Sequence, residues 1–521
     1  MPKEISRKRL LSSERGLKAK KKGRFAMALC YPNTYEIAMS NLGFLTIYRM
    51  ANELAHLRCE RAFYWPQSGK TIESGREIGK FDVVGISLSY ELDYPRAVTM
   101  IGDSGIPLLR EERGESDPLV IAGGCAITLN PQPLTAFVDI FFIGEAEESF
   151  REFANLLAGV GRVRKAGWRK EMLRRASRIE GVHVPGVKDS AKRRWVSRLD
   201  ALNTSSPLLT PNSHFSDMYL TEVGRGCPRG CRFCAASYVY RPFRIRSAAS
   251  IIEHARSDDL EFPRIGFVGA AVSDHPGIER LCMEFAKRGK EVGISSLRPD
   301  NLTPRLLSTL VETGMRTVTL APEAGSEKMR GMIGKAMTQD RILQSAQMCQ
   351  EVGVRNLRLY FMIGLPFETD SDADAIVELA TGISKTFRRR ISVRLGAFVP
   401  KANTPFQWQP IASSEVVERR VGVIKKGLSS GKNIRVFARS VREVEVQAIF
   451  SRGGVDVGTA LYNWYSGRNW KRAFRNAGVN RQRLLYDRLS TEAHLPWDFI
   501  DMSFPKSLLK RELMKAERAA S

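Results

Sequence analysis

The first part of the chain alternates short apolar runs with longer segments of helical periodicity. FAMALCYP (25–32), FDVVGISLS (81–89), PLVIAGGCA (118–126) and VDIFFIGEAEESF (138–150) are compact apolar runs, several of which end in Gly- or Ser-containing turns. FLTIYRMANELAHL, between the first two, places apolar residues at helical spacing. Buried strands that alternate with helices predict an α/β fold with a Rossmann-like, doubly wound parallel sheet over residues 25–150.

The same alternation resumes near residue 217. Six apolar runs, each separated from the next by a helical stretch, follow at roughly 30-residue spacing: 218–226, 264–272, 291–297, 316–324, 355–366 and 390–400. Such a series predicts a partial (β/α)6 barrel over residues 213–412. We assign the other segments by composition: 1–24 to a basic disordered tail, 151–212 to a basic linker with a helix, and 413–521 to a small, mainly helical C-terminal region.

Composition narrows the class of protein. No apolar run approaches the ~18 residues of a membrane helix, and the N-terminus lacks the apolar core of a signal peptide. The eight cysteines do not resemble a disulfide framework, so we expect a cytoplasmic protein with no membrane partner. The net charge is +25, and the first 24 residues hold ten basic and two acidic residues. That segment is either a solvated tail or an arm that contacts nucleic acid.

Three cysteines, Cys227, Cys231 and Cys234, lie within eight residues directly after the first predicted barrel strand. A structural zinc site usually takes four protein ligands, and a ferredoxin-like [4Fe-4S] cluster takes four cysteines, so zinc would need a distant fourth ligand. Three thiolates on a four-iron cluster leave one iron open to a small molecule. The arginines of this loop, Arg225, Arg229 and Arg232, either bind anionic groups or form a solvated rim.

The Cys-x3-Cys-x2-Cys loop, with Phe233 before its last cysteine, resembles that of the radical S-adenosylmethionine (SAM) superfamily. The resemblance implies that the three cysteines ligate a [4Fe-4S] cluster whose fourth iron chelates the amino and carboxylate groups of SAM. It also implies reductive cleavage of SAM to a 5′-deoxyadenosyl radical, with the electron supplied by a donor such as flavodoxin or ferredoxin.

The later strand ends of the barrel match the superfamily's SAM contacts in order. The turn Gly269-Ala270-Ala271 lacks the glutamate that relatives carry, so it implies backbone contacts only. The SAM-contacting residues implied by the resemblance are Phe233, Gly269, Ala270, Ser296, Arg298, Glu323, Ile363, Gly364, Pro366 and Val399.

Residues 25–150 resemble the cobalamin-binding domain that precedes many radical enzymes. The residues that carry this resemblance, and would contact cobalamin, are Ser87, Ser89, Gly123, Gly124, Gly144 and Glu145. Ser40 occupies the place of the cobalt-ligating histidine of other such domains, which implies a cobalamin bound without a histidine ligand. The alternative is a fold of this type that has lost its cofactor.

Nearly the whole chain is similar to one family of uncharacterised radical proteins with a cobalamin-like N-terminal domain. Departures from that family are SRGGVDVG (451–458) and His183, which stands where an aromatic residue is usual. The leading hypothesis is a radical SAM enzyme that transfers a methyl group through cobalamin to an unreactive carbon. No residue is assigned to the substrate chemistry.

Two rival functions stay open. The first is an RNA-modifying radical enzyme similar to the methylthiotransferases, favoured by the net charge of +25 and the basic segment 160–197. The second is a non-enzymatic iron–sulfur or cobalamin sensor.

Overall fold

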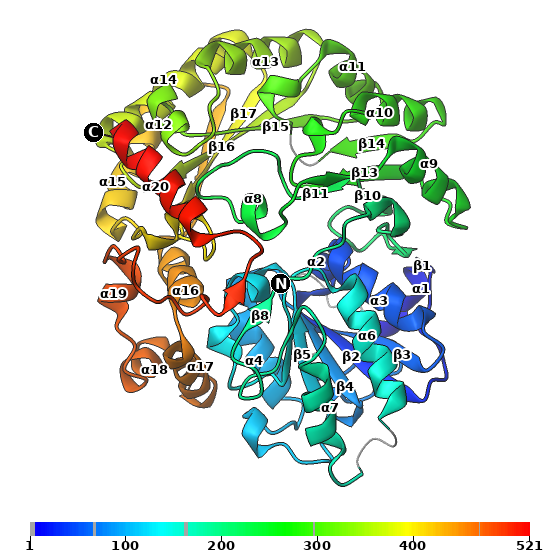
Figure 1. The fold of residues 1–521 in the computed structure, drawn as a ribbon. Coiled ribbons are helices and arrows are strands. Elements are labelled where there is room, and N and C mark those ends of the chain that lie inside the picture. Colours follow the sequence, from blue (N-terminus) through cyan, green and yellow to red (C-terminus); the bar gives the residue numbers. More distant parts are fainter. Residues whose placement is uncertain (1–5, 66–68, 161–164, 295–296, 468, 521) are drawn as a thin grey trace.

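This computed structural model describes residues 6–65, 69–160, 165–294, 297–467 and 469–520. Two α/β units lie one above the other in Figure 1, and the last part of the chain runs along both of them. None of the described helices is long and apolar enough to cross a membrane. The mixed α/β class and the parallel sheets that the hydrophobic pattern predicts are confirmed.

A six-stranded sheet in the order β3-β2-β4-β5-β6-β7 forms the first unit. All neighbours are parallel except β7, which pairs antiparallel with β6. The strand bounds are β2 Phe25–Thr34, β3 Leu57–Trp65, β4 Val83–Ser87, β5 Leu119–Gly123, β6 Ile140–Phe142 and β7 Val182–His183. The order of the first five is that of flavodoxin-like doubly wound sheets, whose ligands bind beyond the carboxyl ends of the strands where the strand order reverses.

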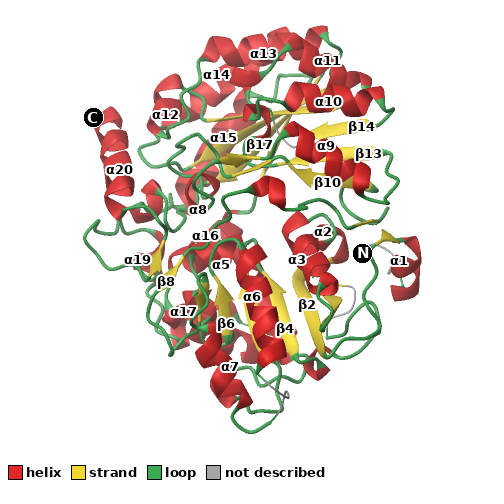
Figure 2. Cartoon of the chain, turned by 45° about the vertical axis from the view of Figure 1, so that its right-hand side comes forward, coloured by secondary structure: helices red, strands yellow, loops and turns green. Residues whose placement is uncertain are grey.

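Alternate residues of β2 supply two separate cores, one on each face of this sheet. Met27 and Leu29 pack with helices α3, α6 and α7, whereas Ala26 and Ala28 pack with α4 and with helices from the C-terminal region. The bounds are α2 Tyr35–Ala38, α3 Leu42–Glu53, α4 Tyr94–Gly102, α5 Cys125–Leu129, α6 Ala146–Gly159 and α7 Trp168–Ala176. The small side chains of Ala26 and Ala28 let α4 and the C-terminal helices approach the sheet closely. Figure 2 shows the strands of this sheet with helices around them.

Much of segment 151–212, expected as a linker, belongs to the first unit instead. Trp168 and Met172 of α7 are buried in its core, and β7 is its sixth strand. His183 lies between the rings of Phe141 and Phe499. Burial is the main cause that lowers the pKa of His183 to about 4, so the imidazole fills this aromatic position as a neutral ring.

The second unit contains seven parallel strands in two sheets, where the sequence predicts six strands in one barrel. One sheet has the order β10-β13-β14 and the other β15-β16-β17-β18. Leu297, after β14, donates a backbone hydrogen bond to Thr319 of β15, which links the two. The strand bounds are β10 Met218–Glu222, β13 Arg264–Val268, β14 Glu291–Ile294, β15 Thr317–Glu323, β16 Asn356–Ile363, β17 Arg390–Ala397 and β18 Ile434–Ala438.

Helices cover the outer side of both sheets of the second unit (Figure 1). They are α9 Ala248–Ser257, α10 Ile278–Lys287, α11 Pro304–Glu312, α12 Glu327–Met332, α13 Gln339–Glu351, α14 Asp370–Thr386 and α15 Ser414–Gly427. Six of the seven begin at a Ser or Thr whose side chain accepts a hydrogen bond from the first turn or forms a capping box, as at Ser247 and Thr369.

The C-terminal region, expected to be small and mainly helical, packs against both units and adds a strand to a sheet. Its strand β18 extends the second sheet, its helices α16 and α17 pack against the first unit, and α20 packs against α12. The remaining bounds are α16 Val441–Arg452, α17 Val455–Gly467, α18 Trp470–Asn476, α19 Arg481–Leu485, β19 Ile500–Asp501 and α20 Lys506–Ala520. Strand β19 pairs with β8, Ala191–Lys192. This region therefore joins the two units.

The described part of the basic N-terminal segment is also ordered, contrary to the predicted disordered tail. Helix α1 (Arg7–Ser13) is followed by β1 (Arg15–Gly16), which pairs with β9 (Leu208–Leu209). Leu10 is 3% exposed, and Glu14, just after α1, contacts the buried Arg61 of β3.

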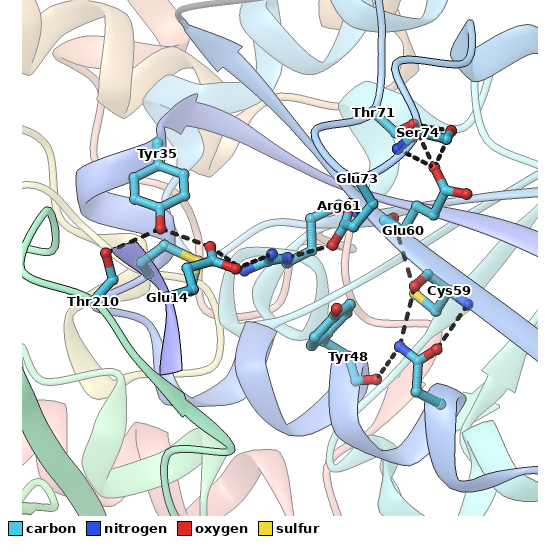
Figure 3. Close-up of polar contacts among 12 residues, drawn as sticks. Glu14, Tyr35, Tyr48, Cys59, Glu60, Arg61, Thr71, Glu73, Ser74 and Thr210 are labelled. Atoms are coloured by element: carbon cyan, nitrogen blue, oxygen red, sulfur yellow. Dashed lines mark hydrogen bonds and ion pairs between the residues drawn. The ribbon is translucent and has the colours of Figure 1, made fainter. Parts of the chain in front are cut away.

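Arg61 is the centre of a buried polar network (Figure 3). Its guanidinium lies 2.7 Å from Glu14 and 2.7 Å from Glu73, and over the ring of Tyr48. Tyr35 donates a hydrogen bond to Glu14, which adds the start of α2. One cation therefore holds the N-terminal segment against the sheet, with two carboxylates that satisfy its buried charge.

We expect Arg61→Met to lower the free energy of unfolding by about 3–5 kcal/mol, because two buried carboxylates lose their partner. Urea unfolding at pH 8 measures the loss.

Burial raises the pKa of Glu73 even in the presence of Arg61. Without Arg61 the pKa of Glu73 should rise further, so the defect should shrink as the pH falls and this carboxyl takes up a proton in the variant. Arg174→Met, which breaks the exposed pair with Glu171, is the control and should cost less than ~1 kcal/mol. Equal losses in the two variants would contradict this role of Arg61.

Candidate active site

The three-cysteine loop lies between β10 and the short helix α8 (Ala236–Val239), at the carboxyl end of the parallel sheet. Cys231 is 7% exposed, whereas Cys227 and Cys234 are half-buried. The Cys234 backbone N–H donates to the Cys231 carbonyl oxygen at 3.1 Å, which curls the loop. Gly226, with a φ of 82°, permits the turn into it. Phe233 packs half-buried against the core shared with the first unit.

Burial is the main cause that raises the pKa of Cys227 and, to about 11, that of Cys231. Each of these two thiols also responds to the charge of Cys234, so the three lie near one another. No three His, Cys, Asp or Glu side chains within the described ranges are grouped to hold one metal ion. Ligands of separate iron atoms in a cluster stand farther apart than ligands around one ion. The donor set of three thiols on a curled loop fits a cluster.

The arginines of the loop are neither a solvated rim nor free anion binders, because each one is paired with an acid. Arg225 contacts Glu145 at 2.9 Å and Glu147 at 2.7 Å, and also Glu222. The other two pairs are Arg229 with Asp274 after β13, at 2.5 Å, and Arg232 with Glu512 of α20, at 3.1 Å.

Asp274 is a residue of the site that the motif comparison did not select. Its Oδ1 accepts hydrogen bonds from Arg229 and Asn301, while its buried Oδ2 has no partner among the described residues. Its charge raises the pKa of Cys227, which places the carboxylate beside the cysteine loop. A carboxylate five residues after Gly269, outside the usual turn, was the signal that could have identified it.

Arg298, after β14, belongs to the same polar group. Its backbone N–H donates to Ser273 Oγ at 3.2 Å, and its side chain contacts Asp300 at 2.7 Å. Its charge lowers the pKa of both Cys227 and Cys231. Ser296, the other SAM contact expected on this segment, lies outside the described residues.

Glu323 ends β15 with a φ of 70°, a conformation that is uncommon for residues other than glycine. Lys335 lies 2.9 Å from its carboxylate and also lowers the pKa of Cys231. The lysine is 9% exposed. The lysine thus joins this strand end to the cysteine loop, although no local motif marked it.

The expected SAM contacts Ile363, Gly364 and Pro366 lie at the end of β16 and in the turn after it. Gly364 has a φ of 74°, and a Cβ there would lie 2.9 Å from Ala412. Its backbone N–H donates to Glu368 at 2.5 Å. Ile363 and Pro366 are buried, as is Val399 beyond β17, which is 9% exposed. These four expected SAM contacts therefore shape the ends of adjacent strands, and Glu368, which pairs with Arg420, supports the turn.

A cavity of about 480 Å³ lies at the carboxyl ends of the strands of the first unit and reaches the second. All six residues expected to contact cobalamin line it, together with Gly269 and Ala270 of the SAM set: Ser87, Ser89, Gly123, Gly124, Gly144 and Glu145. The cysteines of the loop are not among the lining residues, although Gly226 and Tyr240 on either side of them are. Two of the predicted SAM contacts thus share this cavity with the predicted cobalamin contacts, whereas the other described SAM contacts do not line it.

The cavity also extends inward between the sheet and its helices. Met27 and Gly85 line it from the sheet, Ile47 from α3 and Phe150 from α6. Ser40 lines the cavity, and no described lining residue is a histidine. This long, largely apolar cavity with glycines at its rim fits a cofactor with a nucleotide-like tail and no histidine ligand to its metal.

Glu145 has a structural role beyond the one expected. Its carboxylate contacts Arg244 at 2.6 Å and Arg225 at 2.9 Å, and accepts the Val196 N–H at 2.8 Å. Burial, the largest influence, raises the pKa of Glu145, but the two arginines together outweigh it and lower the pKa. A single buried carboxylate therefore joins the first unit to Arg225, before the cysteine loop, and to Arg244, after it.

Cys125 brings a fourth thiol to this junction from the first unit. It lines the cavity at the start of α5, and Tyr240 lies beside it. Burial is the main cause that raises the pKa of Cys125 to about 11, and Cys234 adds to that rise. Cys125 and Cys234 are therefore neighbours across the two units.

Comparisons with known families agree with this arrangement. Residues 43–185 match the family described as Radical SAM proteins, N-terminal, and residues 221–380 match the Radical SAM superfamily. The uncharacterized protein MJ0966 of Methanocaldococcus jannaschii is 29% identical over 434 residues, which cover 82% of this chain and 88% of that protein. The anaerobic magnesium-protoporphyrin IX monomethyl ester cyclase of Rubrivivax gelatinosus is 27% identical over 31% of this chain and 30% of its own length.

Among solved structures, the cobalamin-dependent S-adenosylmethionine radical enzyme OxsB with aqua-cobalamin bound is similar, with a TM-score of 0.50. The similarity covers 95% of this chain and 81% of that chain at 13% identity, and therefore concerns the fold alone.

We expect Glu145→Gln to lower the free energy of unfolding at pH 7.5 by about 3–5 kcal/mol, because Arg225 and Arg244 lose a buried counter-charge. The lowered pKa of Glu145 stabilises the fold above the ordinary glutamate pKa and ceases to do so as the pH falls. The difference between wild type and variant should therefore narrow toward pH 4.

Urea unfolding followed by tryptophan fluorescence measures this difference. The control is Glu148→Gln on the same helix, whose carboxylate is 50% exposed and pairs with Arg194; it should cost less than ~1 kcal/mol. A Glu145→Gln variant as stable as this control would show that the contact does not join the units.

Proposed function

Because this chain carries domains of the radical SAM superfamily, we propose that it is an enzyme that cleaves SAM reductively and transfers a methyl group through cobalamin to an unreactive carbon. The observation that supports this most is the position of the three-cysteine loop. It lies at the carboxyl end of a parallel sheet, next to the cavity that both units line. In (β/α) proteins this end of the strands holds the chemistry.

Cys227, Cys231 and Cys234 would hold a [4Fe-4S] cluster. When bound, the cluster supplies the electron for cleavage of the SAM sulfonium, and cobalamin supplies a carrier for the methyl group. The electron would come from a one-electron donor such as flavodoxin or ferredoxin.

The chain's own residues would bind and orient SAM. Asp274 offers a buried carboxylate oxygen without a partner to the amino group of SAM, in the absence of the usual glutamate. Glu323 and the turn at Gly364 would contact the ribose and adenine. Arg298 and Lys335 place positive charge beside the thiols, which favours their deprotonated, ligating form.

The 480 Å³ cavity would hold only a part of cobalamin, its tail, between the sheet and helices α3 and α6. Gly124 and Gly144 have positive φ and pack against the backbones of Leu88 and Arg194, which fixes the strand ends that line the cavity. The side chain of Cys125 faces the same cavity next to the cysteine loop, so a substrate between the two cofactors would contact it.

We expect Cys231→Ala to lose most of its iron and sulfide after anaerobic reconstitution, and to form no 5′-deoxyadenosine from SAM under a strong reductant. The physical reason is that two thiolates hold a four-iron cluster poorly. Cys282→Ala is the control, because that thiol lies on α10, away from the cysteine loop and the cavity. It should retain iron and SAM cleavage. Unchanged 5′-deoxyadenosine formation by Cys231→Ala would refute the radical mechanism.

Cobalamin binding can be tested by filling the cavity. A Cβ at Gly43, on the first turn of α3, meets nothing closer than Asn41 Oδ1 at 3.3 Å, so Gly43→Leu should fold with its side chain in the cavity. We expect at least a tenfold loss of affinity for hydroxocobalamin, measured by cobalt content and absorbance after gel filtration.

Gly159→Leu, at the exposed end of α6, has no neighbour within 4 Å and is the control. A wild-type protein that binds no cobalt after reconstitution would exclude the methylase reaction while leaving SAM cleavage open.

A further inference from the structure

The sheet β15-β16-β17-β18 has two very different faces. On the outer face, Leu357, Leu359, Ile391 and Val393 are fully buried in the core with helices α13, α14 and α15. The opposite face, here called the inner face, is formed by the alternate residues. It includes Arg358, Tyr360, Arg394, Arg435 and Phe437.

Strand register places these inner-face residues in two rows. Arg358 pairs with Ser392, which pairs with Arg435, and Tyr360 pairs with Arg394, which pairs with Phe437. Side chains of register partners point to the same side of a sheet. Three arginines and two aromatic rings therefore share one small area.

The inner face is not a second hydrophobic core. Tyr360 is 39% exposed, Phe437 is 42% exposed and Arg435 is also exposed. Parallel sheets are usually covered on both sides, and their strands are then apolar throughout. The alternation of apolar and polar residues in NLRLYFMI (356–363) is instead that of a sheet with one face left for water or a ligand.

The arginines of this face lack acidic partners. Within the described parts of the chain, Arg358, Arg394 and Arg435 form no ion pair and donate no side-chain hydrogen bond. Arg394 lies 4.4 Å from the centre of the Phe437 ring, and its buried Nε has no acceptor. The carboxylate of Glu323 at the end of β15 is paired with Lys335. Half-buried guanidinium groups without acceptors favour an anion from outside the chain.

The neighbouring sheet contributes apolar side chains rather than charge to this face. Strand register pairs Leu220 of β10 with Gly266 of β13, and Gly266 with Gly293 of β14. Tyr219 and Ile265, the preceding residues of β10 and β13, are buried toward the helices. Met218 and Leu220 lie against these glycines, since their side chains would be 2.5 Å and 2.8 Å from a Cβ at Gly266, and they bring no charge to the arginines.

We propose that the inner face binds the substrate of this enzyme through oxyanionic groups, either carboxylates or phosphates, with Tyr360 and Phe437 in contact with the carbon skeleton. This inference rests on the proposed function, for which it names the class of substrate. Planar guanidinium groups bind both kinds of oxyanion through paired hydrogen bonds. Arg394 is three residues before the end of β17, roughly 10 Å at ~3.3 Å per residue, so a bound anion leaves room for SAM at the strand ends.

Titration calorimetry on the anaerobically reconstituted protein, at constant low ionic strength, tests this proposal. Inorganic pyrophosphate and citrate are the probes for phosphates and carboxylates. We expect wild type to bind at least one of them, and Arg394→Gln and Arg358→Gln to bind it at least tenfold more weakly. Arg394→Lys, which keeps the charge but not the planar fork, should lie between wild type and Arg394→Gln.

Arg355→Gln is the matched control, because Arg355 is exposed just before β16 and outside the inner face. Preference for pyrophosphate would indicate a phosphorylated substrate, and preference for citrate a polycarboxylate. Absence of binding to wild type, or equal affinities in Arg394→Gln and Arg355→Gln, would overturn the proposal. Thermal unfolding of each variant verifies that it is folded.

The same samples are assayed for 5′-deoxyadenosine formation under a strong reductant without substrate. If SAM is cleaved but the anions do not bind, the inner-face proposal fails and the proposed function stands. If the anions bind through Arg394 but SAM is not cleaved, the radical mechanism fails and the anion site stands.

Discussion

The position of the cysteine loop depends on the ion pairs of its own arginines. Arg225 pairs with carboxylates of the first unit, Arg229 with Asp274 after the second barrel strand, and Arg232 with Glu512 of the C-terminal helix. Arg225 and Arg232 are about nine-tenths buried, and a buried charge must be paired. The loop can therefore reach this conformation only when all three parts of the chain have assembled around it.

This dependence couples the two units at the place where the proposed cofactors would meet. Glu145 lies between β6 and α6 of the first unit, lines the cavity and also binds Arg225, two residues before Cys227. A change in the distance between the units would thus shift the cavity wall and the cysteine loop together. A reaction that passes a group between two cofactors requires this kind of fixed geometry.

The two units of the molecule use parallel strands for different purposes. In the first unit, helices cover both faces of the sheet, and the ligand cavity is confined to the strand ends and the space beneath α3 and α6. In the second, helices cover only the outer face, and Arg358, Tyr360 and Arg394 stay accessible on the other. An uncovered face costs hydrophobic burial, and a binding function is a physical reason to retain it.

The sequence by itself determined the features that depend on neighbouring residues. Apolar periodicity predicted both parallel-sheet regions, and spacing within a few residues identified the cysteine loop and the glycine turns at Gly123 and Gly364. Only the tertiary structure decided which charges meet: Arg225 and Glu147 are 78 residues apart, and Arg232 and Glu512 are 280 apart. It also decided that β18 joins the sheet and that α7 joins the first unit. Local patterns specify elements, whereas long-range pairing follows from how the elements pack, so these contacts leave no signal in the local sequence.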